Sequence, residues 1–240
     1  MKHLARALAF LVVAALAACG QQTVPGPQTV KGTVTTMEGA PAVLGGALLL
    51  VNLSAVDPGP VAVTPIDEQL YATTLSAVNQ DGSLELALPS GAELPDELLF
   101  PAAGFFHNLD PETCSLSTSA DVRVSAMAVA ELPFPAVMLV TMDGPSLALT
   151  TTTPMDLDDP EVSILDFTLF SWVYAEEGVR IATPEGGCTV DSVTYQLDLA
   201  LEPGWNPVAL DLEGDAEAGS VTGVSLTNGS SAELHFTWLF

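Results

Sequence analysis

Residues 232–240 read Ala-Glu-Leu-His-Phe-Thr-Trp-Leu-Phe, and this stretch indicates the fold class. Its large apolar residues alternate: Leu234, Phe236, Trp238 and Phe240. A β-strand would place these four side chains on one face of a sheet and turn His235 to the other face. The pattern therefore predicts a buried strand that closes a β-sheet.

The same period of two recurs through the chain, while Gly, Pro, Asn and Asp interrupt it about every eight to twelve residues. Strands are predicted at 29–35, 47–53, 71–78, 83–88, 122–130, 136–142, 146–152, 164–174, 179–183, 193–201, 207–212, 221–227 and 232–240. No stretch beyond the N-terminus has clear helical periodicity. We therefore expect an all-β protein built of antiparallel sandwiches of the immunoglobulin or transthyretin kind.

Short turn sequences separate the predicted strands. Asp81-Gly82 favours a β-hairpin, and Asp143-Gly144-Pro145, Glu177-Gly178 and Asn228-Gly229 are similar breaks. The apolar run 126–142 contains Glu131, Pro133 and Pro135, so two core strands around a Pro-rich turn explain it better than a membrane segment does.

The composition is acidic and apolar at once. The 240 residues include 30 Asp and Glu but only five Lys and Arg, for a net charge of −25. Such a body cannot neutralise phosphates, which excludes nucleic acid as a partner, and an anionic membrane surface would repel it. Charged residues make up only 15% of the chain and apolar residues 48%, which favours a packed body over a disordered one.

The N-terminus carries the most specific motif. Lys2 and Arg6 precede a short apolar run, and the run ends in Leu16-Ala17-Ala18-Cys19. This segment is too short to span a bilayer and has the composition of a signal peptide. It resembles the lipobox of bacterial lipoproteins. The resemblance implies cleavage after residue 18, a diacylglycerol (with palmitate or a similar acyl chain) on Cys19, and attachment to the cell envelope.

The resemblance also implies a location for the mature chain. Gly20 stands where Asp commonly retains a lipoprotein at the inner membrane, so the outer membrane is expected if the source has two membranes. Residues 19–28 are short, uncharged and rich in Gly, Pro and Gln, which predicts a flexible tether. After processing, only Lys31, Arg123 and Arg180 remain basic against thirty acidic residues, for a net charge near −27.

Cys114 and Cys188 are the only cysteines besides Cys19. Two cysteines in an exported chain are expected to form a disulfide bond. A reactive thiol would need a basic neighbourhood, and the residues near both positions are mainly Asp, Glu, Gly and Thr.

Residues 29–91 resemble a carboxypeptidase-regulatory-like domain, a small transthyretin-like sandwich. The resemblance rests on Val30-Lys31-Gly32-Thr33-Val34, on Gly46-Ala47 before an apolar strand, and on Asp81-Gly82-Ser83-Leu84. The stretch at 84–91 is also echoed at 197–204. These features predict two domains in series, at 29–92 and 114–240, with a linker or loop at 93–113.

No motif for catalysis is evident. Besides His3 in the signal segment, the histidines are His107 and His235, and neither lies in a recognisable triad or zinc-binding pattern. The Gly-x-Ser-x-Gly elbow and the Gly-rich phosphate loops are absent. The sequence therefore predicts neither a catalytic site nor a bound cofactor.

Two features leave binding open. Acidic residues crowd two segments and are candidate calcium ligands: Asp156, Asp158, Asp159 and Glu161 in one, and Asp211, Glu213, Asp215 and Glu217 in the other. Solvated acidic turns are the simpler interpretation. Aromatic residues are candidates for a sugar-binding platform, namely Trp172, Tyr174, Trp205 and Trp238. Trp205, which follows Gly204 in a predicted turn, is the one candidate for exposure among them, and core packing is the favoured interpretation of all four.

The sequence thus favours a lipid-anchored envelope protein that acts as a non-enzymatic structural or binding module. Its protein or polysaccharide partner is unknown. A calcium-modulated adhesion or carbohydrate-binding module is the alternative, and a hydrolase of unrecognised type is a further one.

Overall fold

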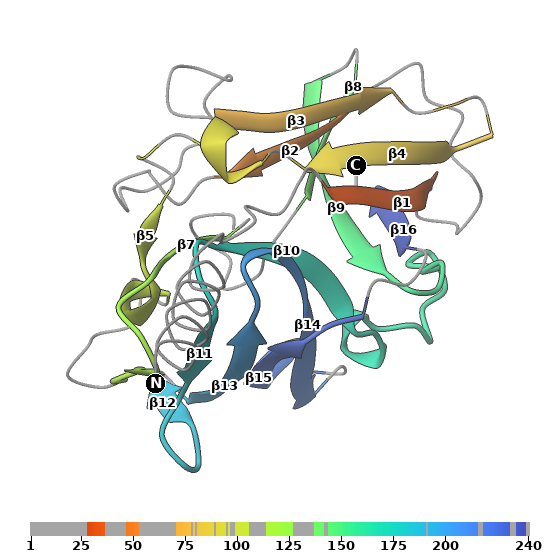
Figure 1. Ribbon diagram of the computed structural model, residues 1–240. Helices are drawn as coiled ribbons and strands as arrows, with labels where there is room; N and C mark the ends of the chain where they lie inside the picture. Colours follow the sequence, from red (N-terminus) through yellow and green to blue (C-terminus); the bar gives the residue numbers. More distant parts are fainter. Residues whose placement is uncertain are drawn as a thin grey trace, which may run out of the picture.

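The computed structural model describes residues 28–36, 47–52, 71–77, 79, 81–88, 90–94, 96, 99–105, 114–126, 137–141, 144–190, 192–215, 218–230 and 234–238. These residues form two curled β-sheets and three short 3₁₀ turns, η1 (Gly91–Glu93), η3 (Ala102–Gly104) and η4 (Ile164–Asp166). Figure 1 shows one sheet above the other. The all-β prediction is confirmed.

Sheet 1 has seven strands in the order β3-β2-β8-β9-β16-β1-β4. Their bounds are β1 (Gln28–Thr35), β2 (Ala47–Asn52), β3 (Tyr71–Ala77), β4 (Ser83–Leu88), β8 (Val137–Thr141), β9 (Gly144–Thr151) and β16 (Leu234–Trp238). β1 and β16 pair in parallel, and the other neighbours are antiparallel. The two outermost strands, β3 and β4, also contact each other, so the sheet curls strongly.

Sheet 2 has nine strands, eight of them in the order β5-β7-β10-β14-β15-β13-β11-β6, with β12 paired to β13. Their bounds are β5 (Phe100–Pro101), β6 (Ser117–Thr118), β7 (Arg123–Ala126), β10 (Leu169–Ala175), β11 (Val179–Ala182), β12 (Cys188–Val190), β13 (Val193–Leu201), β14 (Gly204–Asp215) and β15 (Ser220–Asn228).

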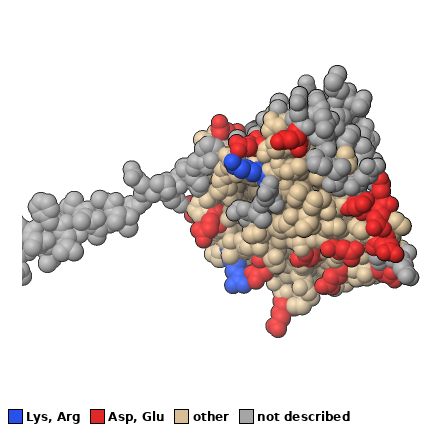
Figure 2. Space-filling view, turned by 90° about the vertical axis from the view of Figure 1, so that its right-hand side faces the viewer, with Lys and Arg blue, Asp and Glu red and all other residues tan. Residues whose placement is uncertain are grey.

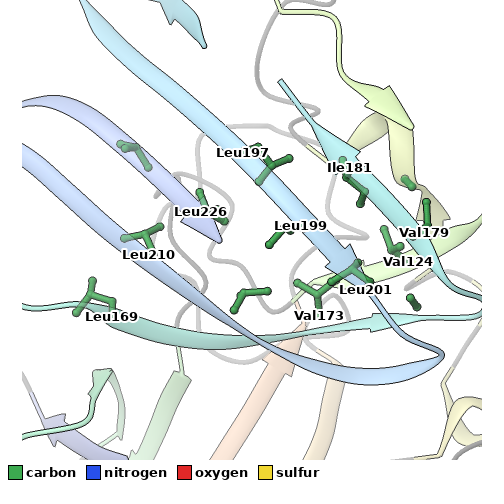
Figure 3. Packing of buried hydrophobic residues seen from close by; sticks show 14 of the residues in the cluster. Val124, Leu169, Val173, Val179, Ile181, Leu197, Leu199, Leu201, Leu210 and Leu226 are labelled. Atoms are coloured by element: carbon green, nitrogen blue, oxygen red, sulfur yellow. The ribbon is translucent and has the colours of Figure 1, made fainter. Parts of the chain in front are cut away.

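Sheet 2 curls around an aliphatic core. Alternate residues of its strands point into this core. Along β13, Leu197, Leu199 and Leu201 are buried and the residues between them are exposed. Figure 3 shows these leucines facing side chains from β10, β11 and β14. Burial of such side chains is the main favourable term in folding.

A second core joins the two sheets. Sheet 1 contributes Val34, Leu84, Leu88, Leu234 and Phe236, and sheet 2 contributes Phe170, Trp172, Tyr174, Trp205 and Ala209. All seven residues of β10 are buried, because one face of this strand packs in the core of sheet 2 and the other packs against sheet 1.

Most predicted strands agree with observed ones, whereas the short strands β5, β6 and β12 were not predicted. The strand predicted at 193–201 has the observed bounds, and β16 places the buried side chains of Leu234 and Phe236 on one face as expected. The strand predicted at 164–174 begins instead at Leu169, because Ile164–Asp166 form a 3₁₀ turn capped by the Ser163 hydroxyl.

The hairpin predicted at Asp81-Gly82 is only partly correct. The turn forms, with Gly82 at φ +82° and its amide donating to the Asn79 carbonyl. However, the flanking strands pair elsewhere, β3 with β2 and β4 with β1. Turn chemistry fixes a local reversal of the chain, whereas burial of the apolar faces decides which strands become neighbours.

The strand pairing does not follow the predicted domains at 29–92 and 114–240. β8, β9 and β16 all come from the second of these ranges, yet they lie in sheet 1 between β2 and β1. A division at residues 93–113 would therefore cut through one sheet. Between β9 and β1, β16 packs Phe236 against Trp172 of β10, so burial of its apolar face favours this place in sheet 1.

Candidate functional site

A groove of about 970 Å³ opens where the two sheets meet. Its walls come from four parts of the chain: Gln28–Lys31 of β1, Phe170–Trp172 of β10, Trp205 and Pro207 of β14, and Gly229, Ser230 and Leu234 around the start of β16. This volume is in the range of small-molecule sites in proteins. Lys31 is the only charged residue among these described lining residues.

The floor of the groove is aromatic but well covered. Trp172 and Trp205 are each only 4% exposed, and Phe170 is 8% exposed. Core packing, the favoured interpretation, is therefore confirmed for Trp172, Tyr174 and Trp205, and the alternative of an exposed Trp205 is wrong. Trp205 lies in β14, directly after Gly204, and its indole is buried in the core between the sheets.

Ring packing explains this burial. Trp172 stacks on Phe236 with ring centroids 6.3 Å apart, and Trp205 meets Tyr174 edge to face at 5.5 Å. A flat sugar platform needs an open ring face, whereas Trp172 and Trp205 are each packed against a neighbouring ring and are almost fully buried. The side chain of Trp238 lies outside the described part of the chain.

The Asn206 side chain holds the corner where β14 begins. Its Nδ2 donates to the carbonyls of Glu202 and Gly204, each at 2.8 Å, and to that of Val173 at 3.3 Å. Its Oδ1 accepts from the Glu202 amide at 2.8 Å. Asn206 is buried, and these bonds hold the backbone at the start of β14 in place. The neighbouring residue, Trp205, is thereby positioned beside the groove.

Cys114 and Cys188 form the predicted disulfide bond, with Cα atoms 5.3 Å apart. Both residues are buried. The bond ties the segment before β6 to β12 and closes a loop across a sequence separation of 74 residues.

The first acidic segment folds as a series of turns. The carboxylate of Asp156 accepts from the amide of Asp158 at 3.2 Å, and that of Asp159 accepts from the amide of Glu161 at 2.9 Å. All four side chains are exposed. The acidic residues here therefore serve as local turn formers.

The second acidic segment belongs to β14 instead of a solvated turn, because the strand predicted to end at residue 212 continues to Asp215. Asp211, Glu213 and Asp215 are exposed on β14, and a register irregularity after Glu213 interrupts their alternation. Asp211 accepts from the Thr168 hydroxyl at 2.5 Å, and Asp215 accepts from the Ala218 amide at 3.0 Å. Glu217 lies outside the described residues.

Over the residues that the structure describes, no three His, Cys, Asp or Glu side chains are grouped so that they could hold a metal ion. His235 lies in β16, where its Nδ1 is buried without a hydrogen-bond partner among the described atoms. His107 lies outside the described residues.

The three basic residues of the body all form surface ion pairs. Lys31 lies 2.6 Å from Glu85, and Arg180 lies 2.9 Å from Asp198. Arg123 pairs with Glu176 at 2.6 Å and with Asp96, and hydrogen bonds to these two carboxylates raise the pKa of its guanidinium. In Figure 2, acidic side chains are scattered over the visible face and basic ones are few.

The groove is the site that the sequence did not predict. Its residues come from four strands that are distant in sequence, so no motif or spacing marks it. Strand prediction alone also could not show that β16 returns to lie beside β1.

Comparison with known proteins gives no relative: no family model matches the chain, and neither a curated protein nor a solved structure is significantly similar to it. The described residues contain no helix with the length and apolar character needed to cross a membrane.

Proposed function

We propose that this chain is a bacterial lipoprotein, anchored in the cell envelope through an acyl group on Cys19, whose β body is a non-enzymatic binding or structural module. The resemblance of Leu16-Ala17-Ala18-Cys19 to a lipobox is the basis of the proposal. The body extends from Gln28, where β1 begins, and the preceding residues serve as signal and tether.

The disulfide bond between Cys114 and Cys188 is the structural observation that supports the proposal. The chain has three cysteines, and Cys114 pairs with Cys188, so Cys19 is the one thiol left for another role. A disulfide also points to an oxidising compartment outside the cytoplasm, which is where a lipoprotein matures.

The groove between the sheets is the best candidate for a binding surface of the body. It combines a covered aromatic floor with a rim of small and polar residues, including Thr29 and Ser230. Polar groups of this kind fix the orientation of a ligand in a mostly apolar site.

The test is to express the full chain and its Cys19→Ser variant in a bacterial host supplied with labelled fatty acid. The wild type should take up the label and sediment with membranes, whereas Cys19→Ser should take up none and be released in soluble form. One acyl chain holds a protein only marginally, so firm retention requires two or more. Label in both proteins, or equal membrane retention, would contradict the proposal.

A matched control keeps this test specific. Replacing the other two cysteines together, Cys114→Ser with Cys188→Ser, should leave the fatty-acid label in place while removing the disulfide. The calcium-modulated alternative is tested separately by thermal unfolding in millimolar calcium and in chelator. A clear rise of the midpoint with calcium would favour that alternative.

A further inference from the structure

The groove lies at the end of the body where the tether is attached. Gln28, the first residue of β1, is itself one of the lining residues. Any lipid on Cys19 is therefore connected to the wall of this groove by residues 19–27 alone. Nine residues span at most about 30 Å even when fully extended.

The hairpin of β14 and β15 runs away from the same end. Trp205 and Pro207 line the groove near the start of β14, and Gly229 and Ser230 line it just after β15 ends. At the other end of the hairpin Asp215 pairs with Ser220. β14 has 12 residues, which at about 3.3 Å per residue is close to 40 Å.

The reach of the tether is thus shorter than the β14–β15 hairpin. With a reach of about 30 Å against a hairpin of about 40 Å, the body cannot invert so that the hairpin tip rests on the bilayer directly beneath Gln28. Full extension of the tether would also cost conformational entropy, which keeps the attached end closer still.

The charges agree with this geometry. Lys31 is the only charged residue among the described residues of the groove. The opposite half of the hairpin exposes Glu213 and Asp215. Lys31 pairs with Glu85 at 2.6 Å, so the pair adds no net charge to the groove, whereas a bilayer with anionic headgroups would repel the carboxylates near the tip.

We propose that the groove end of the body, marked by Thr29 and Ser230, is its membrane-facing surface and lies against the headgroup layer of the bilayer, with the β14–β15 tip directed away. This inference rests on the proposed lipidation of Cys19. It assigns a defined orientation to the body, so that the groove opens toward lipid and the acidic tip toward other partners.

The experiment compares fluorophores at the two ends of β15. In the full lipidated protein, Ser230→Cys places a fluorophore at the groove and Ser220→Cys places one at the tip, and both serines are exposed. The two ends of β15 are nine residues, or about 30 Å, apart. After reconstitution in vesicles, lipids with a nitroxide on the headgroup should quench the fluorophore at residue 230 several-fold more than the one at residue 220.

A second pair guards against a variant that fails to fold. Thr29→Cys and Thr222→Cys repeat the comparison at two exposed threonines, one at the groove and one near the tip. Equal quenching at both ends, or stronger quenching at the tip, would overturn the proposed orientation.

Intact mass separates the two proposals. If the acyl adduct is present and quenching is equal, only the orientation is wrong. If the adduct is absent, the proposed lipidation is wrong and the orientation that depends on it falls as well.

Discussion

The indole of Trp172 stacks on the ring of Phe236, with the ring planes inclined by only 22°. Trp172 belongs to β10 of sheet 2 and Phe236 to β16 of sheet 1, so this contact joins the two sheets. Phe236 is fully buried, and Trp172 also lines the groove. The same side chain, Trp172, therefore both packs against β16 and forms part of the floor of the groove.

Phe236→Ala should destabilise the whole body. Removing a fully buried ring leaves a cavity between the sheets, which typically costs about 3–5 kcal/mol of unfolding free energy. Urea unfolding followed by Trp fluorescence measures the loss. Phe236→Leu keeps most of the contact and should cost clearly less; equal losses for the two variants would argue against tight ring packing here.

Gly32→Ala should also weaken the junction of the sheets. A Cβ at residue 32 would lie 2.5 Å from the Leu234 carbonyl oxygen and 2.5 Å from Cε2 of Phe236. Overpacking of this kind costs about 1–3 kcal/mol. The matched control is Gly104→Ala, where nothing lies within 4 Å of the added carbon and no loss is expected.

Much of the fold is predictable from the sequence because its strands are regular. The alternation Leu197, Leu199, Leu201 predicts both the strand and its buried face, and the structure confirms both. Which strands pair with each other could not be predicted in the same way. Nothing local in residues 234–238 indicates that they pair in parallel with β1, because that choice depends on the apolar faces of distant strands.

The Asn206→Asp variant tests the corner that begins β14. The carboxylate would face three carbonyl oxygens where the amide now donates, and a buried unpaired charge costs about 3 kcal/mol or more. Burial would raise the pKa of the new carboxyl above its usual value near 4. The loss of unfolding free energy relative to wild type should therefore be largest at neutral pH and become smaller as the pH falls and the carboxyl is protonated.

Asn228→Asp is the control for this substitution. Asn228 also bonds backbone groups through its side chain, to the amide and carbonyl of Ala200, but it is exposed. Water can solvate the new charge there, so the loss should be much smaller. Chemical unfolding at several pH values measures both variants, and similar losses would contradict the account of Asn206.

Removing the disulfide should lower stability without abolishing the strands. In the chain-entropy model, closing a loop of this length contributes about 4.5 kcal/mol, and measured values typically lie near 2–4 kcal/mol. Urea unfolding of the Cys114→Ser, Cys188→Ser double variant gives the loss. The unfolding midpoint of wild type in reductant should match that of the double variant. A wild-type midpoint that is the same with and without reductant would contradict a stabilising role of the disulfide.

Ser83→Ala should raise the pKa of Asp81. In the folded protein the Ser83 hydroxyl, at 2.6 Å, and the Ser83 amide, at 3.0 Å, donate to the Asp81 carboxylate and lower its pKa. This carboxylate therefore stabilises the fold above the unfolded pKa near 3.9, and the contribution is lost as the pH falls through the folded pKa.

Carboxyl carbon NMR titration of wild type and Ser83→Ala measures this shift. Only the hydroxyl bond is removed, so the pKa should rise part of the way toward its ordinary value. Glu93 is an internal control, because its pKa is lowered by bonds from Ser90 and should not change. An unchanged Asp81 pKa would show that the amide alone is responsible.

The candidate site was far less predictable than the strands. Trp205 drew attention in the sequence because Gly204 predicted a turn, yet Tyr174 and the opposing sheet cover its ring. Asp211 and Glu213 were candidate calcium ligands, yet both are side chains of one extended strand, β14. In each case the residue type was informative, but its surroundings were supplied by a strand distant in sequence.

Intact mass spectrometry of the protein extracted from host membranes tests the proposed lipidation of Cys19. We expect a chain that begins at Cys19, carries at least a diacylglyceryl adduct, and is two hydrogens lighter than its reduced form because Cys114 and Cys188 are joined. An unmodified chain that retains residues 1–18, or a mature chain with a free thiol at residue 19, would contradict it.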